Sequence, residues 1–478
     1  MSTEGLHVDR RVRSLFWLAF LLAAFTGTIA LDTPVLGNRA FLTDFRAFYC
    51  AGWVRLSGND PYRVEPLRRC EARALGIGQP PARGVVVPAP LPGFDLALFS
   101  LFARLPFATA AVLWEVLAVV AIGFSVVALG RLTGLEPEVP LAALLLSEGV
   151  ASLFFGQLVP LSLAALIAAM LFASRDRPAL AALCTTLAFV EPHIGIGAWL
   201  SLLFFAPRSR GALLVGAALL GGISVACNGV HGELEYVRAV VPAHVLSEIH
   251  NDDQYSFTYL ASLLGAGDRA AAFLGSLSYV ALLALGLVCA RILAQHTREP
   301  ALLIALPTAL LLVGGPFVHV HQIAAALPAA LLLYVRLPQS RFAFGAAAFL
   351  LAIPWIHIFL LLQFWLVLIG VVFVLSARLL GSDLLKQLCL AAVIFGSLVL
   401  ANVLFTAPAV PPPGGGAAGN ALAETVWRSY IDARHTSNRA LFFALKLPTW
   451  LGLLLLTGNA ARFALRVRGA DVRSRALP

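Results

Sequence analysis

The sequence predicts an all-α, polytopic membrane protein in which one integral domain takes up all 478 residues. Apolar residues make up 60% of the chain and charged residues 12%, and the mean hydropathy is +0.87. An ordinary soluble domain is only about 45–50% apolar. Apolar runs that approach the ~20 residues needed to cross a bilayer also recur along the whole chain. These observations exclude a water-soluble globule and predict a bundle of about 12–14 transmembrane helices.

Fourteen apolar runs are candidate spans, and several of them are short. The first run follows three arginines as a signal peptide does, but it is long for such a segment and no cleavage motif follows, so we expect an uncleaved first span. Treating 178–206 and 342–379 each as one kinked span lowers the number of crossings to twelve. The runs cover 14–31, 108–130, 139–155, 158–173, 178–191, 193–206, 211–227, 270–293, 300–318, 322–336, 342–354, 356–379, 386–406 and 441–461.

The basic residues predict the orientation of the chain. The formal net charge is +9, but the cations are scattered between apolar runs and do not form the patch that nucleic acid requires. With the N-terminus in the cytoplasm, the short basic loops all fall on the cytoplasmic side, as the positive-inside rule demands. The sequence therefore indicates a multi-pass protein of the cell membrane. The cations on that side include Arg131, Arg175, Arg177, Arg208, Arg210, Arg291, Arg298, Arg336, Arg341, Arg378, Lys386 and the arginines of 462–475.

Three long segments then lie outside the cell: 32–107, 228–269 and 407–445. The first contains nine arginines and two helix-forming runs, 45–56 and 91–105, which we expect to lie as helices on the outer membrane surface. The third contains a Pro- and Gly-rich stretch and predicts a flexible loop over 407–440. Eight of the ten histidines also fall at or beyond the outer ends of the spans, so an active site is expected to face outward. They are His193, His231, His244, His250, His319, His321, His357 and His435.

Asp44 is the strongest candidate for a catalytic group. It lies between the apolar pair Phe41 and Leu42 and the aromatic Phe45, a setting that raises the proton affinity of a carboxylate and suits it to act as a general base. Thr43 and Asp44 before an apolar run also form a plausible helix N-cap, and spacing alone does not decide between the two roles.

Further polar residues interrupt the apolar runs. Gln157 follows a glycine at the outer junction of two spans, and Glu191 and His193 flank a proline at the break in another stretch. Ionisable groups at such positions are costly unless they are functional, although a structural polar plug is the alternative. Glu115 and Glu148 lie within spans, where the sequence does not name their partners.

The sequence alone leaves metal binding and disulfide formation undecided. His319 and His321 share a face only if that segment is extended, and no further ligand group lies near them in the sequence. We therefore expect no metal and no other cofactor. Cys50 and Cys70 both fall in the first outer loop, where an oxidising compartment allows a disulfide.

Four ordered stretches resemble the GT-C superfamily of membrane glycosyltransferases, and more narrowly glycosyltransferase family 87, the polyprenyl-phosphate-mannose-dependent mannosyltransferase group. Together they extend over about residues 40–330. The chain departs from the family at one step, where Glu191 precedes the proline in place of the usual lysine. The stretches are 44–49 leading to 58–62, then 88–92 with 105–107 and Trp114, then 156–157, and finally Pro316 with His321 and Pro328.

The resemblance implies an inverting transfer of a hexose, with mannose expected, from a polyprenyl-phosphate sugar to a hydroxyl of a glycolipid, polysaccharide or other envelope acceptor. Asp44 is implied as the general base on the extracytoplasmic face. Arginines of the first outer loop are candidates to hold the lipid phosphate through charge-assisted hydrogen bonds. The expected substrate-binding residues are Arg46, Tyr49, Arg55, Asp60, Tyr62, Arg63, Arg68, Arg69, Gln157, Glu191, His193, His319 and His321.

Two other classes of protein fit part of the pattern. Broken spans at Pro192 and Pro354 and the intramembrane glutamates are also typical of a transporter or flippase for a lipid-linked or polar solute. The long, arginine-rich outer loop and the lack of paired half-repeats count against that class. A noncatalytic envelope scaffold has the same topology but makes Asp44 replaceable.

Overall fold

The computed structural model describes residues 3–31, 41–74, 85–381, 384–404, 419–434 and 439–476. The structure is 83% helical. Within the described ranges, extended pairing is limited to two isolated bridges, Arg63 with Leu422 and Gln254 with His319. The predicted all-α class is therefore confirmed.

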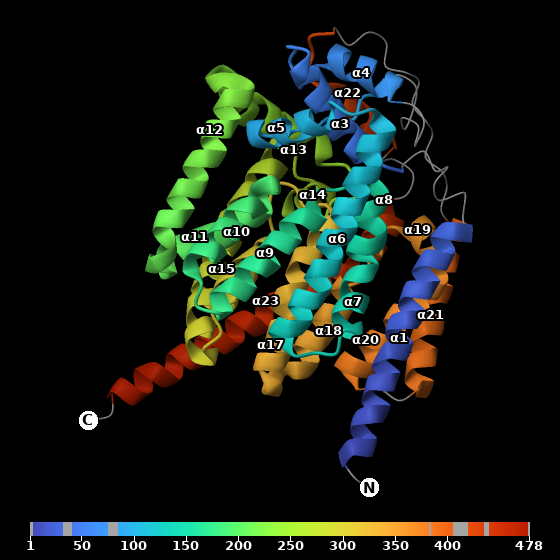
Figure 1. Cartoon of the computed structure of the whole chain (residues 1–478), viewed down its shortest axis with the longest axis vertical. Helices are drawn as coiled ribbons and strands as arrows, with labels where there is room; N and C mark the ends of the chain where they lie inside the picture. Colours follow the sequence, from blue (N-terminus) through green and yellow to red (C-terminus); the bar gives the residue numbers. More distant parts are fainter. Residues whose placement is uncertain are drawn as a thin grey trace.

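Among the described residues, six helices are long and apolar enough to cross a membrane. Most of them run roughly along the long axis of the molecule, α23 crosses obliquely, and the start of α1 and the end of α23 lie at the same end (Figure 1). Large hydrophobic side chains such as Val120, Leu219 and Phe273 remain exposed on them, as lipid contact requires. The chain is thus a multi-pass membrane protein. The six are α1 (Thr3–Leu31), α6 (Phe107–Thr133), α12 (Arg210–Glu235), α15 (Asp268–Thr297), α21 (Leu384–Leu404) and α23 (Arg439–Ala476).

Shorter and broken apolar helices fill the space between the long ones. One pair is bent by 45° between 138–145 and 147–155, and a second by 116° between 320–336 and 338–351, which allows up to eight crossings by length. Breaks fall at Gly156 and Pro192, where the sequence predicted them. These elements are α7 (Glu138–Leu145), η1 (Ser147–Ser152), α8 (Leu153–Phe155), α9 (Val159–Ser174), α10 (Pro178–Leu187), η2 (Ala188–Val190), α11 (Pro192–Phe205), η3 (Pro207–Ser209), α16 (Leu302–Leu311), η5 (Val320–Ala326), α17 (Leu327–Arg336), η6 (Pro338–Ser340), α18 (Arg341–Leu351), α19 (Ile358–Gln363), α20 (Trp365–Leu375) and η7 (Ser376–Leu380).

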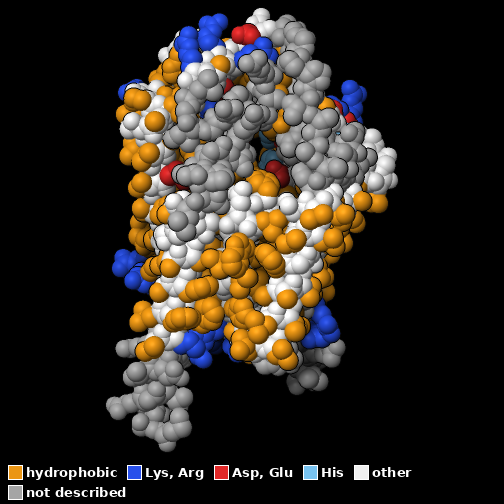
Figure 2. Space-filling view, turned by 90° about the vertical axis from the view of Figure 1, so that its right-hand side faces the viewer, with side chains coloured by type: hydrophobic (Ala, Val, Ile, Leu, Met, Phe, Trp, Pro, Cys, Tyr) orange, Lys and Arg blue, Asp and Glu red, His pale blue; other side chains and the backbone are white. Residues whose placement is uncertain are grey.

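A second, smaller layer of helices covers one end of this bundle. Helices α3, α4, α5, α13 and α22 gather there, at the top of Figure 1. In the space-filling view, basic side chains lie at both ends of the molecule, and between them the surface is largely apolar (Figure 2). We call this second layer the cap layer. It consists of α3 (Thr43–Leu56), α4 (Val64–Arg73), α5 (Gly93–Phe102), η4 (Tyr236–Val240), α13 (Val241–Glu248), α14 (Phe257–Leu263) and α22 (Ala423–Arg434).

Helix α3 is a core element of the cap layer, and the expectation of a helix lying on a surface is wrong for it. Ten of its fourteen residues are buried. The ring of Phe45 stacks on Trp114 of α6 at 5.4 Å and contacts Phe99 of α5 at 6.2 Å. Aromatic side chains surround this helix on several sides, so its apolar residues do not form a single stripe. The second expected helix, 91–105, is present as α5.

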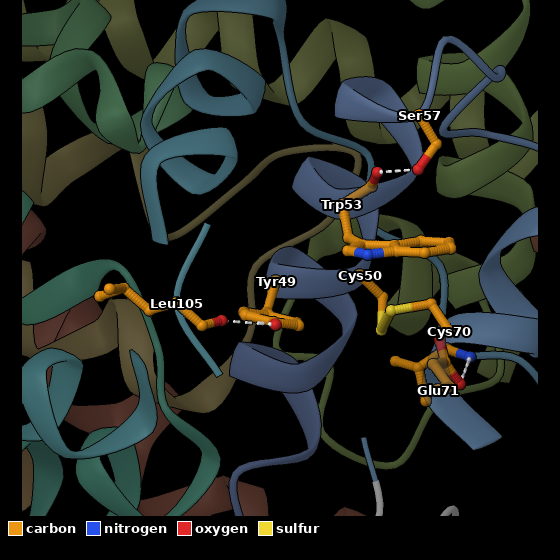
Figure 3. The surroundings of a disulfide bond; sticks show 8 residues. Tyr49, Cys50, Trp53, Ser57, Cys70, Glu71 and Leu105 are labelled. Carbon is orange, nitrogen blue, oxygen red and sulfur yellow. Dashed lines mark hydrogen bonds between the residues drawn. A yellow bond between two sulfur atoms is a disulfide. The ribbon is translucent and has the colours of Figure 1, made fainter. Parts of the chain in front are cut away.

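A disulfide joins α3 to α4 in this layer (Figure 3). Cys50 and Cys70 are bonded, with 5.5 Å between their Cα atoms. In the same region the Tyr49 hydroxyl donates to the Leu105 carbonyl at 2.8 Å. The bridge settles the pairing that the sequence left open, and it fixes the helix that begins beside Asp44.

The third outer segment is folded where the structure describes it. The Pro- and Gly-rich stretch 411–416 and His435 lie outside the described residues. Residues 423–434 form α22, which packs against α13, and Trp427 donates to Glu248 at 2.5 Å. The flexible loop expected over 407–440 therefore does not extend through this helix.

Candidate active site

The chain enters α3 through a strained turn that presents Asp44. Leu42 precedes the helix in the left-handed conformation, with φ of 53°, and its N–H donates to the Phe154 carbonyl at 2.8 Å. A left-handed non-glycine residue is held only where its surroundings enforce it, and such strain clusters at functional sites. Leu42 occupies the N-cap position of α3, and Asp44 lies inside the first turn of the helix. The N-cap alternative for Asp44 is therefore wrong.

Gln157 holds the Asp44 carboxylate in place. Its amide Nε2 donates to Asp44 Oδ2, while Oδ1 accepts no hydrogen bond from the described part of the chain. Gly156 makes this contact possible, since its φ is +72° and an added Cβ would lie 2.5 Å from the Cβ of Phe45. Trp114 also donates to the Gly156 carbonyl at 3.1 Å. One carboxylate oxygen is thus fixed and the other is available to a ligand.

A carboxylate and a histidine from two further segments face Asp44. Glu248, at the end of α13, contacts His319 Nε2 at 3.1 Å and accepts from Asn251 at 2.6 Å. Burial opposes the charged form of His319, but the hydrogen bond and charge of Glu248, with the charges of Asp253 and Asp44, outweigh it and raise the histidine pKa. The raised pKa favours the protonated form of His319, which lies within electrostatic reach of Asp44.

Asp253 and His357 form a second acid–histidine pair beside the first. His357 Nε2 lies 3.5 Å from Asp253 Oδ1. Two backbone bonds, from Tyr255 N to the Val318 carbonyl at 2.7 Å and from Val320 N to the Asp253 carbonyl at 3.1 Å, bring this segment next to His319. Burial raises the pKa of Asp253, but the adjacent His357 and the charge of His319 more than offset it and hold the pKa below its usual value. Asp253 is thus an anion that favours the protonated form of His319.

The environment of Asp44 tunes this carboxyl to neutral pH. Burial raises its pKa from 3.8 to about 7, with further increases from the charges of Asp253 and Glu248, while His319 and the hydrogen bond from Gln157 lower it. A general base works best when its pKa lies near the working pH. In Figure 2, histidine and acidic side chains are visible in a hollow above the apolar belt. We call the set Asp44, Gln157, Glu248, Asp253, His319 and His357 the acid–histidine cluster.

Replacing His319 with glutamine is expected to shift the proton affinity of Asp44 upward. The positive charge on His319 lowers the Asp44 pKa, so its removal moves the acidic limb of the rate–pH profile to higher pH. The profile of kcat/KM measured from pH 5 to pH 9 checks this. His296→Gln, an exposed site on α15, should leave the limb in place, and an unmoved limb in His319→Gln contradicts the electrostatic link.

Glu191 and His193 lie on the other side of His319. Gln322 Nε2 donates to Glu191 Oε2 at 3.4 Å, and His193 Nε2 lies 3.6 Å from the same oxygen. The rings of His319 and His321 stack at 5.4 Å. The structure therefore brings five of the residues predicted from the sequence into one region with Asp44: Gln157, Glu191, His193, His319 and His321.

Arg46 contacts this region from within the cap layer. Its side chain is 0% exposed, and it lies within electrostatic reach of Glu71 and Asp44. Burial raises the Glu71 pKa to about 8, against the opposing effect of Arg46. With no exposed surface, the Arg46 guanidinium serves as a buried counter-charge to the carboxylates around it.

Most of the other predicted binding residues make contacts within the cap layer, with the loops beside it or with the end of α12. Arg63 pairs with Asp60 at 2.7 Å and with Glu235, and Arg68 pairs with Glu65 at 2.9 Å. The remaining contacts run from Tyr49 to the Leu105 carbonyl, from Tyr62 to the Leu91 carbonyl at 2.8 Å and from Arg55 to the Cys227 carbonyl at 2.5 Å, while Arg69 is exposed. The structure does not gather these residues around Asp44.

The sequence-based prediction did not include Glu248 or Asp253, and it placed His357 only among the outer histidines. The adjacent pair Asp252 and Asp253 in an outer segment was an available signal, but Glu248 had none, because only the fold brings the end of α13 to His319. Among the residues that the structure describes, no group of three His, Cys, Asp or Glu side chains is placed to hold a metal ion.

The fold and the acid–histidine cluster define an all-α, multi-pass membrane protein with a cluster of carboxylates and histidines at one end of its bundle. Residues 92–318 match the family model of glycosyltransferase family 87. The match confirms the family resemblance of the sequence and indicates a glycosyltransferase. It includes Gln157, Glu191, Glu248 and Asp253, and it ends next to His319. No curated protein and no solved structure matches the chain.

Proposed function

We propose that this protein transfers a hexose, with mannose foremost, from a polyprenyl-phosphate sugar to a hydroxyl of a glycolipid or other envelope acceptor, on the extracytoplasmic face of the cell membrane. The single observation that carries the proposal is Asp44. This carboxyl is half-buried, its pKa is raised to about 7, and one of its oxygens is held by Gln157 while the other is available.

The chemistry follows from these groups. Asp44 takes the proton of the acceptor hydroxyl as that oxygen bonds to the anomeric carbon of the donor. The bond from this carbon to the phosphate oxygen breaks, its electron pair leaves with the polyprenyl phosphate, and the anomeric configuration inverts. A phosphate leaves as a stable anion, so the site needs a base and positive charge but no protonating acid. The cationic His319, beside Glu248 and Asp253, supplies positive charge in this region.

The test of the proposed function is release of lipid phosphate. Purified protein in nanodiscs is incubated with a panel of polyprenyl-phosphate sugars and envelope lipids, and both the released polyprenyl phosphate and the glycosylated lipid are measured. Release coupled to a new glycolipid supports a lipid-phosphate-dependent glycosyltransferase and names its donor. An absence of release with every donor overturns the proposal and favours a transporter or flippase, in which Glu191 is the first residue to replace.

The rate of transfer is expected to rise with pH through about 7. Asp44 is active only after it has lost its proton, and burial raises the pKa at which this happens from 3.8 to about 7. Activity is therefore lost as the pH falls through 7, about three units above the range in which an exposed aspartate loses its charge. Initial rates at saturating donor from pH 5 to pH 9 measure this limb, and a flat profile between pH 5 and pH 8 contradicts the role of Asp44.

A further inference from the structure

A groove opens on the side of the bundle along α12, away from the acid–histidine cluster. It has a volume of about 470 Å³ and lies between α10, η2 and α11 on one side and α12 on the other. Its wall is apolar, with Phe94, Phe189, Ile196, Trp199 and Leu220 among the lining residues. The neighbouring side chains on the outer faces of these helices are exposed and hydrophobic, such as Leu187 and Leu219. The groove therefore faces the hydrocarbon layer.

One end of the groove is built by a kink in α12. Gly229 departs from helical geometry, with φ of 74° and ψ of 161°, so the last turns of α12 bend back toward α5. Glu233 there accepts from the Gly93 N–H and from Asn228, both at 3.0 Å, and Ser224 accepts from the Phe94 N–H at 3.0 Å. The kink thus places a carboxylate at the outer end of an otherwise apolar groove.

A second carboxylate, that of Asp95, lies next to this end of the groove. Asp95 follows the lining residue Phe94 and is 1% exposed, and neither of its carboxylate oxygens has a hydrogen bond within the described part of the chain. Asp95 is within electrostatic reach of Glu191, and Tyr236 is within reach of Asp95, Glu191 and Glu233. A buried carboxylate without a donor is costly, and a ligand that supplies hydroxyl donors removes that cost.

We propose that the groove holds the hydrocarbon chain of the glycolipid acceptor, and that Asp95 and Glu191 bind hydroxyl groups of its sugars. The proposal rests on the proposed function and names the acceptor class for that site. The Glu233 carboxylate lines the outer end of the groove, where it disfavours an anionic headgroup and favours an uncharged polyol, so the phosphate-bearing donor is excluded from this groove. Aromatic walls such as Phe94 and Trp199 suit both an acyl chain and the apolar face of a sugar.

A chain of hydrogen bonds connects Glu191, near the outer end of the groove, with His319. The Gln322 amide donates to Glu191, and the Gln322 side-chain oxygen accepts from the His319 N–H at 2.9 Å. His319 in turn lies within electrostatic reach of Asp44. A sugar at Asp95 and Glu191 therefore directs the rest of its glycan toward the base. The departure of the sequence from its family at Glu191 is explained by this role, because a carboxylate accepts hydrogen bonds from sugar hydroxyls and a lysine cannot.

The test uses two adjacent glycines on α12 as a matched pair. Gly221 lines the groove and Gly222 does not, and an added Cβ meets nothing within 4 Å at either position. Gly221→Leu fills the groove, whereas Gly222→Leu only adds a side chain facing lipid. Binding of radiolabelled dodecyl maltoside, an alkyl chain with an uncharged sugar head, is measured on the full-length protein in nanodiscs, with unlabelled dodecyl phosphate as the anionic competitor of equal chain length.

We expect saturable binding to weaken at least tenfold in Gly221→Leu and in Asp95→Asn, to be unchanged in Gly222→Leu, and to resist competition by dodecyl phosphate. Effective competition by dodecyl phosphate, or equal binding by both glycine variants, overturns the proposal. This assay needs no sugar transfer, so its failure and the failure of the proposed function are distinct results. In the transfer assay, Gly221→Leu should raise KM for the glycolipid at least tenfold and leave KM for the donor unchanged, and a change confined to the donor overturns the assignment.

Discussion

Replacing Asp44 with asparagine is expected to lower kcat for sugar transfer by about 10²–10⁴-fold, the usual contribution of a positioned general base. The amide keeps the size of the carboxylate and its contact with Gln157, but it cannot accept the proton of the acceptor hydroxyl. Release of polyprenyl phosphate measures the loss. Asp176→Asn is the matched control, since that carboxylate is exposed at a loop between α9 and α10, and it should retain full activity.

The same substitution is expected to stabilise the protein at alkaline pH. Burial raises the pKa of Asp44 in the folded state above that of the unfolded chain, so the native state loses stability as the pH rises from about 4 through about 7. A neutral asparagine does not carry this cost, and its melting temperature at pH 8 should equal or exceed that of the wild type. Loss of transfer together with retained or higher thermal stability identifies a functional group that is costly to the fold. Retained turnover in Asp44→Asn refutes the general-base assignment.

Removing the disulfide is expected to have the largest effect on stability. The bridge closes a loop between residues 20 apart in the sequence, which stabilises a folded chain by about 3 kcal/mol through the unfolded state. The double variant Cys50→Ser, Cys70→Ser should therefore melt several degrees below the wild type. Its transfer rate should also fall, because the bridge fixes α3, which begins beside Asp44.

The control for this prediction is Cys389→Ser, which removes an exposed free thiol from α21. Its melting temperature should match that of the wild type. Reductant should lower the melting temperature of the wild type to that of the double variant and leave the double variant unchanged. Equal melting temperatures with and without reductant contradict a stabilising bridge in the native protein.

The sequence predicted the elements of the bundle well because their signal is local. A run of apolar residues of sufficient length forms a helix in a membrane whatever its neighbours are, and α6, α15 and α23 lie where such runs were found. The signals for the breaks at Gly156 and Pro192 were also local, since glycine and proline act through their own backbone geometry. The burial of α3 could not be predicted from the local sequence, because it depends on aromatic residues of α5 and α6 that are more than 50 positions away.

The residues of the candidate site also fall into two groups, those that the local sequence indicated and those that only the fold brings together. Asp44 and His319 were identifiable as polar groups among apolar and aromatic residues at the outer ends of spans. Three other features were not identifiable, because each joins segments that the sequence separates. They are the contact of Glu248 with His319, the hydrogen bond from Trp427 on α22 to Glu248, and Asp95 beside the α12 groove, which has no hydrogen-bond partner within the described part of the chain. The sequence offered most of the outer-loop arginines as phosphate ligands by charge alone, yet in the fold Arg55 and Arg63 contact α12 and Arg68 pairs with Glu65.

By itself the sequence determined the class of protein, an all-α bundle in a membrane, together with its family resemblance, and it proposed Asp44 as the base, since hydropathy and short motifs are properties of contiguous residues. Tertiary structure decided which polar groups share the site, which oxygen of Asp44 is available, and how burial tunes its pKa. The physical reason is that burial, charge pairing and hydrogen bonding depend on distances between residues far apart in the chain, and only the packed fold sets those distances.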